Sequence, residues 1–173
     1  MAGDRSLGAS LPGGRTAIKS IKGGSDGGKE NVGKEYTIRG WVRTARKQKA
    51  FSFIEVNDGS TLSGLQVVVN PDCEGYSLID DGQVATGASV AVVGELTESP
   101  GGRQKVELKA SKLQLLGACD ASTYPLQKKK HTLEFLRTIA HLRPRTNTMG
   151  AVMRVRSALA FATHLFFRQR GFQ

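Results

Sequence analysis

Between Tyr36 and Leu116 the sequence alternates apolar and polar side chains in five short runs that are separated by turn residues. A period of two residues is typical of a half-buried strand, because successive side chains point to opposite faces of a sheet. Gly40 lies inside the first run, where a strongly bent strand favours a residue without a side chain. The predicted strands begin at Tyr36 and continue over residues 50–57, 65–69, 89–96 and 106–116.

The order of these elements narrows the fold further. A short polar helix is predicted around Tyr76 to Asp81, so the order is three strands, one short helix and two strands. That is the order of the OB-fold, a five-stranded Greek-key barrel whose exposed face around strands two and three binds single-stranded nucleic acid. The expected fold class is therefore β with appended α, with the barrel over residues 35–117.

The sequence on either side of the barrel lacks this alternation. Residues 1–34 are rich in Gly, Ser and Lys, too polar to bury a core of their own, and are expected to be a disordered tail. A targeting peptide stays open there, although Asp4, Asp26 and Glu30 argue against an acid-poor transit sequence. Residues 118–131 are expected to be a hinge linker, and residues 132–173 to be helical.

Two helices are predicted after the linker. The first covers Leu133–Leu142 and ends before Arg143-Pro144, and the second covers Met149–Arg170 with Gly171 as its stop. Apolar residues recur along the second helix at spacings of three and four, which places them on one stripe. That stripe, which needs a partner surface, consists of Val152, Val155, Leu159, Ala162 and Phe166.

Charge points to an anionic partner. The formal net charge is +10 and the pI is about 10.0. The cationic residues are segregated, since Glu134 is the only acid between Tyr124 and Gln173. A basic excess that serves solubility alone is the alternative, but segregation favours binding to a nucleic acid or another acidic partner.

Several kinds of chemistry have no support in the sequence. Cys73 and Cys119 lie far apart without CxxC spacing, which argues against zinc sites and disulfides and fits reduced thiols in a cytosol-like compartment. The three histidines are scattered without metal-ligand spacing, so neither metal ligands nor catalytic residues are assigned. No GxxxxGK loop, nucleophile–base constellation or membrane-spanning apolar run occurs.

Strand parity identifies a candidate binding surface. If Ile54 and Val56 fill the barrel, then Phe53 must face outward, and the same test turns Gln66 and Glu107 outward. An exposed aromatic ring can stack a nucleobase, while an amide and a carboxylate can bind base edges. The alternatives are that Phe53 packs beneath another segment and that Gln66 and Glu107 are simply solvated.

Two longer runs resemble a known family. GWVRTARKQKAFSFIEVNDGS, LQVVV and TGASVAVVGEL resemble the anticodon-binding barrel of the class IIb aminoacyl-tRNA synthetases, those for Asp, Asn and Lys. The run YPLQKKKHTLEFLRTIAHLRPRTNTMGAVMRVRSALAFATHLFFRQRGF is similar to the asparaginyl member in particular. Aspartyl and lysyl relatives typically carry an RYLD-type segment where this chain has AHLRPRTNT. The asparaginyl member is therefore favoured, and an aspartyl or lysyl relative is the alternative.

The resemblance implies functional positions and partners. The stacking phenylalanine corresponds to Phe53, the glutamine for the central anticodon uridine to Gln66, and the family arginine to Arg46. The acid for the first anticodon base corresponds to Glu107. The implied partner is the asparagine tRNA, and the implied homodimer interface involves Val152, Val155, Leu159 and Phe166. The complete enzymes use ATP and magnesium in the cytoplasm, with an organellar location also open.

The motifs for the ligase chemistry are missing from these residues. Neither the FRxE-type motif nor the later Gly-rich motif ending in Glu-Arg is present. The long helix resembles the helix of the first class II motif, so 132–173 is expected to begin a catalytic domain. The chain alone is therefore expected to bind no ATP and to be inactive as a ligase. A free-standing OB-fold RNA-binding protein with a helical dimerisation tail is the alternative from another class.

Overall fold

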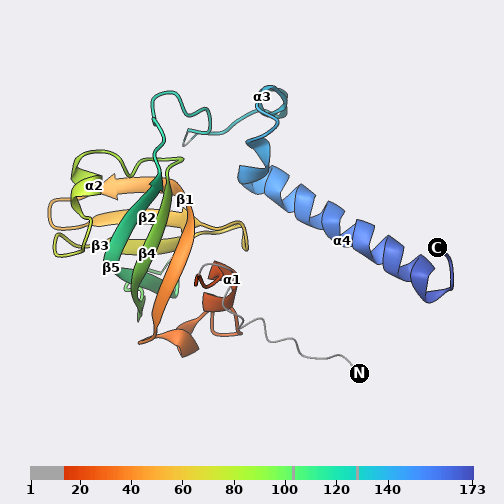
Figure 1. Ribbon diagram of the computed structural model, residues 1–173, viewed down its shortest axis with the longest axis horizontal. Helices are drawn as coiled ribbons and strands as arrows, with labels where there is room; N and C mark the ends of the chain where they lie inside the picture. The colour runs from red at the N-terminus through yellow and green to blue at the C-terminus, as the bar shows by residue number, and fades with distance from the viewer. Residues whose placement is uncertain (1–13, 103, 128) are drawn as a thin grey trace. The chain divides into compact units, whose positions relative to one another are not determined.

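The computed structural model describes residues 14–102, 104–127 and 129–173, which divide into two compact units. The first unit ends at Gln127 and contains a closed barrel (Figure 1). The second begins at Lys128 and is helical.

The barrel has the five predicted strands in the predicted order. The strands are β1 (Glu35–Lys47), β2 (Ser52–Asn57), β3 (Leu65–Val69), β4 (Ser89–Glu98) and β5 (Val106–Gly117), with the helix α2 (Ser77–Asp80) between β3 and β4. Neighbouring strands follow the order β1-β2-β3-β5-β4, and β1 pairs with β4 to close the barrel. The pairing of β3 with β5 is parallel, and the other pairings are antiparallel. This topology confirms the predicted OB-fold.

The long strand β1 belongs to two pairings at once. Residues Glu35 to Trp41 pair with β4, and Trp41 to Lys47 pair with β2. A Cβ atom at Gly40 would lie 2.6 Å from the carbonyl oxygen of Asn57, so only glycine fits where the strand passes so close to β2. The close approach of β2 therefore explains why this position in β1 requires glycine.

The core follows the alternation of the strands. In β2 and β3 every second residue is buried and the intervening residues are only partly covered. The largest fully buried side chains are branched aliphatic groups, which favour strands and pack closely. They include Ile38, Ile54, Val56, Leu65, Val67, Val90, Leu96 and Leu108.

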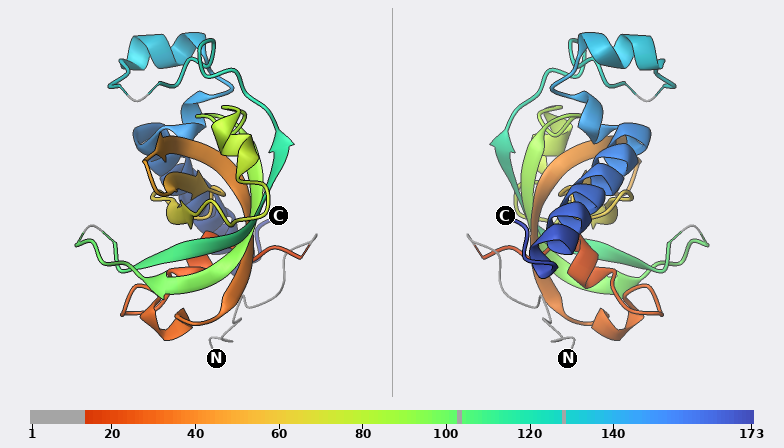
Figure 2. Two further views of the ribbon diagram at one scale, coloured as in Figure 1. Left: turned by 90° about the vertical axis from the view of Figure 1, so that its left-hand side faces the viewer. Right: turned by 90° about the vertical axis from the view of Figure 1, so that its right-hand side faces the viewer.

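The prediction of a disordered tail is wrong for the part of residues 1–34 that the structure describes. Ile18 and Ile21 are both 0% exposed and belong to the barrel core. They lie on the short helix α1 (Ile18–Ile21), which is followed by the 3₁₀ helix η1 (Lys29–Asn31). The backbone N–H of Ile18 donates to Oδ2 of Asp58 at 2.9 Å. Figure 2 shows this red and orange segment lying against the barrel.

The physical reason is that this segment does not need a core of its own. Two isoleucines that add to an existing core remove enough apolar surface from water to order the glycine-rich residues around them. The part of the predicted tail over residues 1–13 lies outside the described residues.

The second unit contains the two predicted helices with shifted ends. The helix α3 (Leu133–Thr138) is shorter than predicted because Ile139, with φ −118° and ψ 48°, leaves the helical conformation. After the 3₁₀ helix η2 (Arg143–Arg145), α4 runs over Asn147–Gln169. Thr146 caps α4 by accepting a hydrogen bond from the backbone N–H of Met149 at 3.4 Å.

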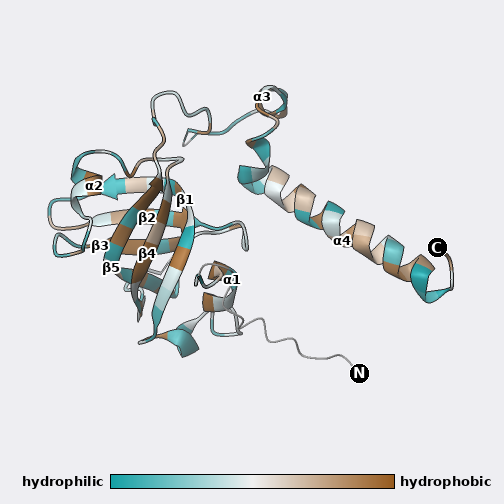
Figure 3. Cartoon of the chain, in the orientation of Figure 1, coloured by the Kyte–Doolittle hydropathy of each residue, from teal (hydrophilic) through white to brown (hydrophobic). Residues whose placement is uncertain are grey.

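The predicted apolar stripe on α4 is present and solvent-exposed. Val155 and Leu159 are 59% and 63% exposed, and Val152 and Phe166 are also exposed. Figure 3 shows hydrophobic and hydrophilic residues interleaved along this helix. No helix in the described residues is long and apolar enough to cross a membrane.

Candidate nucleic-acid interface

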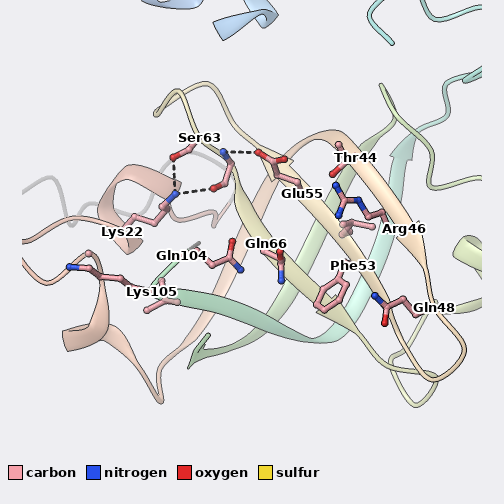
Figure 4. A pocket seen from close by; sticks show the side chains of 14 residues that line it. Lys22, Thr44, Arg46, Gln48, Phe53, Glu55, Ser63, Gln66, Gln104 and Lys105 are labelled. Carbon is pink, nitrogen blue, oxygen red and sulfur yellow. Dashed lines mark hydrogen bonds between the residues drawn. The ribbon is translucent and has the colours of Figure 1, made fainter. Parts of the chain in front are cut away.

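The outer side of β2 and β3 carries a surface pocket with a volume of about 580 Å³. Side chains from the N-terminal segment, β1, β2, β3 and the loop between β4 and β5 line it (Figure 4). They include Lys22, Arg46, Phe53, Glu55, Gln66 and Lys105. Three of the four residues predicted to bind an anticodon, Arg46, Phe53 and Gln66, therefore line this pocket. The fourth, Glu107, is hydrogen-bonded to Gln66.

Phe53 faces outward as strand parity predicts. Its neighbours in sequence, Ser52 and Ile54, are buried, while its own side chain is half-buried and lines the pocket. The ring meets the edge of Phe51, with a centroid distance of 5.0 Å and an interplanar angle of 84°. Such an edge-to-face contact restrains the ring. Phe51 was missed from the sequence, although it lies two residues before Phe53 and so faces the same side.

Arg46 is a cross-strand neighbour of Phe53. The two residues are direct partners in the antiparallel pairing of β1 with β2, so their side chains leave the sheet on the same face. Arg46 is exposed and lines the pocket. Strand parity in the sequence could not place this residue, because the end of β1 could not be located.

Gln66 and Glu107 are joined by a hydrogen bond. Nε2 of Gln66 donates to Oε2 of Glu107 at 3.2 Å, across 41 residues of sequence. The same carboxylate oxygen accepts from Oγ of Ser99 at 3.1 Å and from Nε2 of Gln104 at 3.4 Å. Among the described residues, Oε1 of Glu107 has no hydrogen-bond partner. The network therefore holds the amide and the carboxylate in place and leaves the carbonyl oxygen of Gln66 and Oε1 of Glu107 as acceptors.

Lys22 and Glu55 add charge to the pocket, and the sequence assigned neither a role. Lys22 lies in the segment that was expected to be disordered, so nothing in the sequence pointed to it. It is half-buried, and burial lowers the pKa of its ammonium group, while the carboxylate of Glu55 acts in the opposite direction. Glu55 lies two residues after Phe53 on the same side of β2, and it lines the pocket.

The described residues offer little for metal or thiol chemistry. They contain no cluster of His, Cys, Asp or Glu side chains that could hold a metal ion. Both cysteines are unpaired, and burial raises the pKa of Cys73 to about 11, which leaves its thiol protonated at neutral pH.

The closed barrel and its polar, basic-rimmed pocket define a nucleic-acid-binding domain of the OB-fold type. Residues 36–116 match the family described as "OB-fold nucleic acid binding domain", under the name tRNA_anti-codon. The chain is 55% identical over 158 residues to an asparagine--tRNA ligase of Protochlamydia amoebophila, and 56% identical over 155 residues to the chloroplastic/mitochondrial asparagine--tRNA ligase of Arabidopsis thaliana. These alignments cover 91% and 90% of this chain. Over this stretch the chain is similar in sequence to asparagine--tRNA ligases.

The similarity covers only part of the relatives. The chain spans 34% of the length of the Protochlamydia enzyme and 27% of the Arabidopsis enzyme. A crystal structure of asparaginyl-tRNA synthetase from Pyrococcus horikoshii has the same fold, with a TM-score of 0.74 and 22% sequence identity, over 91% of this chain and 36% of that chain. The sequence similarity confirms the predicted resemblance to asparagine--tRNA ligases, and the aspartyl, lysyl and free-standing alternatives are not favoured.

Proposed function

We propose that the barrel binds the anticodon loop of an asparagine tRNA, as the anticodon-binding part of an asparagine--tRNA ligase. One observation carries the proposal: Arg46, Phe53 and Gln66 line a single pocket, with Glu107 hydrogen-bonded to Gln66. A ring, an amide, a carboxylate and a guanidinium group on one face are the groups that recognition of single-stranded RNA requires.

Each group has a distinct role in this proposal. The ring of Phe53 stacks the central uridine, and the free carbonyl oxygen of Gln66 accepts the N3–H of that base. Oε1 of Glu107 accepts hydrogen bonds from the N–H groups of the first anticodon base, a guanine in the anticodon GUU. Arg46 binds a phosphate. Because Phe51 and the hydrogen-bond network hold these groups before RNA binds, little side-chain entropy is lost on binding.

Binding to an RNA hairpin tests the proposal. A labelled hairpin that carries GUU in its loop should bind the chain saturably, and affinity should fall as salt rises because cationic side chains displace counterions from phosphates. The same stem closed by an uncharged linker in place of the anticodon loop serves as the control and should bind much more weakly. Equal affinity for both molecules would show that the pocket does not bind the loop.

We expect a polypeptide of these 173 residues to show no asparagine-dependent exchange between ATP and pyrophosphate. Both motifs that the resemblance links to the adenylate site are missing from the sequence, and the chain spans about a third of its relatives' length. One structural neighbour was crystallised with asparaginyl-adenylate. ATP, with magnesium, is accordingly proposed as a substrate of the complete enzyme. Exchange above a no-enzyme blank that a mutation within the chain abolishes would contradict this prediction.

The exposed stripe of α4 is proposed to pair with a second copy of the chain. Leaving Val152, Val155, Leu159 and Phe166 in water forgoes about 25 cal/mol per Å² of apolar surface, or several kcal/mol in all. We expect weak, concentration-dependent association, measured by sedimentation from micromolar to millimolar protein. Leu159→Lys should abolish it, while the matched control Arg156→Lys should not. A strictly monomeric chain whose α4 amides are fully protected from exchange would contradict the proposal.

The cellular compartment of the protein is also proposed from its relatives. Asparagine--tRNA ligases among the relatives include a bacterial enzyme and a chloroplastic/mitochondrial one. A cytoplasmic location is proposed, and an organelle that carries out its own translation is the alternative.

A further inference from the structure

Lys22 connects the N-terminal segment to the RNA pocket. It is the residue that ends α1, and its Nζ donates to Oγ of Ser63 at 2.8 Å and to the carbonyl oxygen of Gly64 at 3.0 Å. Both acceptors lie in the turn between β2 and β3, and Figure 4 shows these bonds at the edge of the pocket. Two of the three ammonium hydrogens are thus used to hold one turn.

The β2–β3 turn, for its part, holds the carboxylate of Glu55 in place. The backbone N–H of Gly64 donates to Oε1 of Glu55 at 3.2 Å. A Cβ atom at Gly64 would lie 2.6 Å from the carbonyl oxygen of Val56 and 2.8 Å from Cγ of Glu55, so the turn packs tightly against β2. Glu55 is the direct partner of Gln66 in the pairing of β2 with β3. The two side chains therefore leave the sheet side by side, both into the pocket.

The position of Lys22 is itself fixed by the fold. Ile18, one turn of helix before it, and Ile21, the preceding residue, are fully buried in the barrel core. The backbone N–H of Lys19 donates to Oγ of Ser60 at 2.9 Å, which ties α1 to the same β2–β3 connection. Further along the segment, Gly27 packs so closely on Lys105 that a Cβ atom at Gly27 would lie 2.8 Å from Cδ of that lysine. The segment thus bridges the two loops that border the pocket.

We propose that Lys22 is a positioning residue of the RNA pocket: through the β2–β3 turn it fixes the carboxylate of Glu55 beside Gln66, where the carboxylate and the carbonyl oxygen of Gln66 share the N3–H of the bound uridine in one three-centre hydrogen bond. This inference rests on the proposed function. A fixed carboxylate favours uridine, which presents an N–H at ring position 3, and disfavours cytidine, which presents a lone pair there. Without the ammonium group, the carbonyl of Gly64 loses its donor and the turn relaxes.

A charge-matched pair of variants tests the proposal in the full chain. Lys22→Met and Lys19→Met each remove one cation from the same segment, and the side chain of Lys19 is exposed. Affinity is measured for a GUU hairpin and for the same hairpin with cytidine at the central position. We expect Lys22→Met to lower the preference for uridine about tenfold, as for loss of a charge-assisted hydrogen bond, and Lys19→Met to leave the preference unchanged. Lys22→Arg should restore most of it.

Two further variants show whether Lys22 acts through Glu55. Glu55→Gln should lower the preference as much as Lys22→Met does, and the double variant should lower it no further, because both changes break one chain of contacts. Additive losses, or an unchanged preference in Lys22→Met, would overturn the proposal.

Hydrogen exchange without RNA separates this inference from the proposed function. The amide of Gly64 should exchange faster in Lys22→Met than in Lys19→Met, with amides of β4 and β5 equally protected in both, which also shows that both variants are folded. Unchanged protection of Gly64 would overturn the positioning role. If the unaltered chain binds no hairpin, the proposed function fails and the base-reading role of Glu55 fails with it, even where Gly64 exchange confirms that Lys22 holds the turn.

Discussion

Replacing Ile18 with Ala is expected to lower the free energy of unfolding of the barrel by about 2–5 kcal/mol, the usual cost of a large-to-small change in a core. The side chain of Ile18 is 0% exposed and packs in the same cluster as the strand residues. Its removal opens a cavity where the segment meets the barrel and releases the segment that carries Lys22. Urea denaturation of the full chain measures the change as a lower midpoint.

Val32→Ala is the matched control for this prediction. Val32 belongs to the same segment but is 38% exposed, so its truncation should change the free energy of unfolding by only about 0.5 kcal/mol. If Ile18→Ala leaves the midpoint of urea denaturation unchanged, the segment does not contribute to the barrel core in solution.

Replacing Phe53 with Ala is expected to weaken binding of the GUU hairpin by about 1–3 kcal/mol, since an aromatic ring that stacks a base contributes about that amount. The ring lines the pocket and has Arg46 as its cross-strand neighbour, so a base stacked on it lies within reach of a cation for its phosphate. The measurement is a titration at fixed salt, because salt alone changes affinity for RNA.

Phe53→Leu separates stacking from packing. Leucine keeps apolar volume on the outer face of β2 but offers no flat surface to a base, so it should bind nearly as weakly as Phe53→Ala while folding as well as the unaltered chain. Phe51→Ala should have a smaller effect, because Phe51 acts through its edge contact with Phe53. Unchanged affinity in a folded Phe53→Ala chain would refute the stacking role.

The strands could be predicted from the sequence because their signal is local. A period of two residues fixes which side chains face the core, and it correctly turned Phe53, Gln66 and Glu107 outward. The same signal could not show that Gln66 and Glu107 bond to each other, because that contact depends on the parallel pairing of β3 with β5 across 41 residues. Strand parity placed these three residues on one outer surface, and the resemblance to a family added Arg46 and the roles in anticodon binding.

The structure of the N-terminal segment could not be predicted, because contacts with the barrel, rather than a pattern within the segment, hold it in place. Ile18 and Ile21 are two apolar residues in a stretch rich in glycine and lysine, and their burial requires a barrel that the segment does not itself encode. Lys22 was overlooked for the same reason. The end of α3 at Thr138 likewise depends on the backbone conformation of Ile139, for which the sequence carries no strong signal.

The most direct test of anticodon recognition is the affinity of the full chain for two hairpins that differ only at the central anticodon base, at one salt concentration. Recognition of uridine by Gln66, beside the ring of Phe53, predicts that the hairpin with uridine binds more tightly than the hairpin with cytidine by about 1–3 kcal/mol, or roughly 5- to 150-fold. Gln66→Ala should remove most of that difference and leave the dependence on salt unchanged. Equal affinities for the two hairpins, with a saturable and salt-dependent titration for both, would contradict the claim that this pocket reads the anticodon.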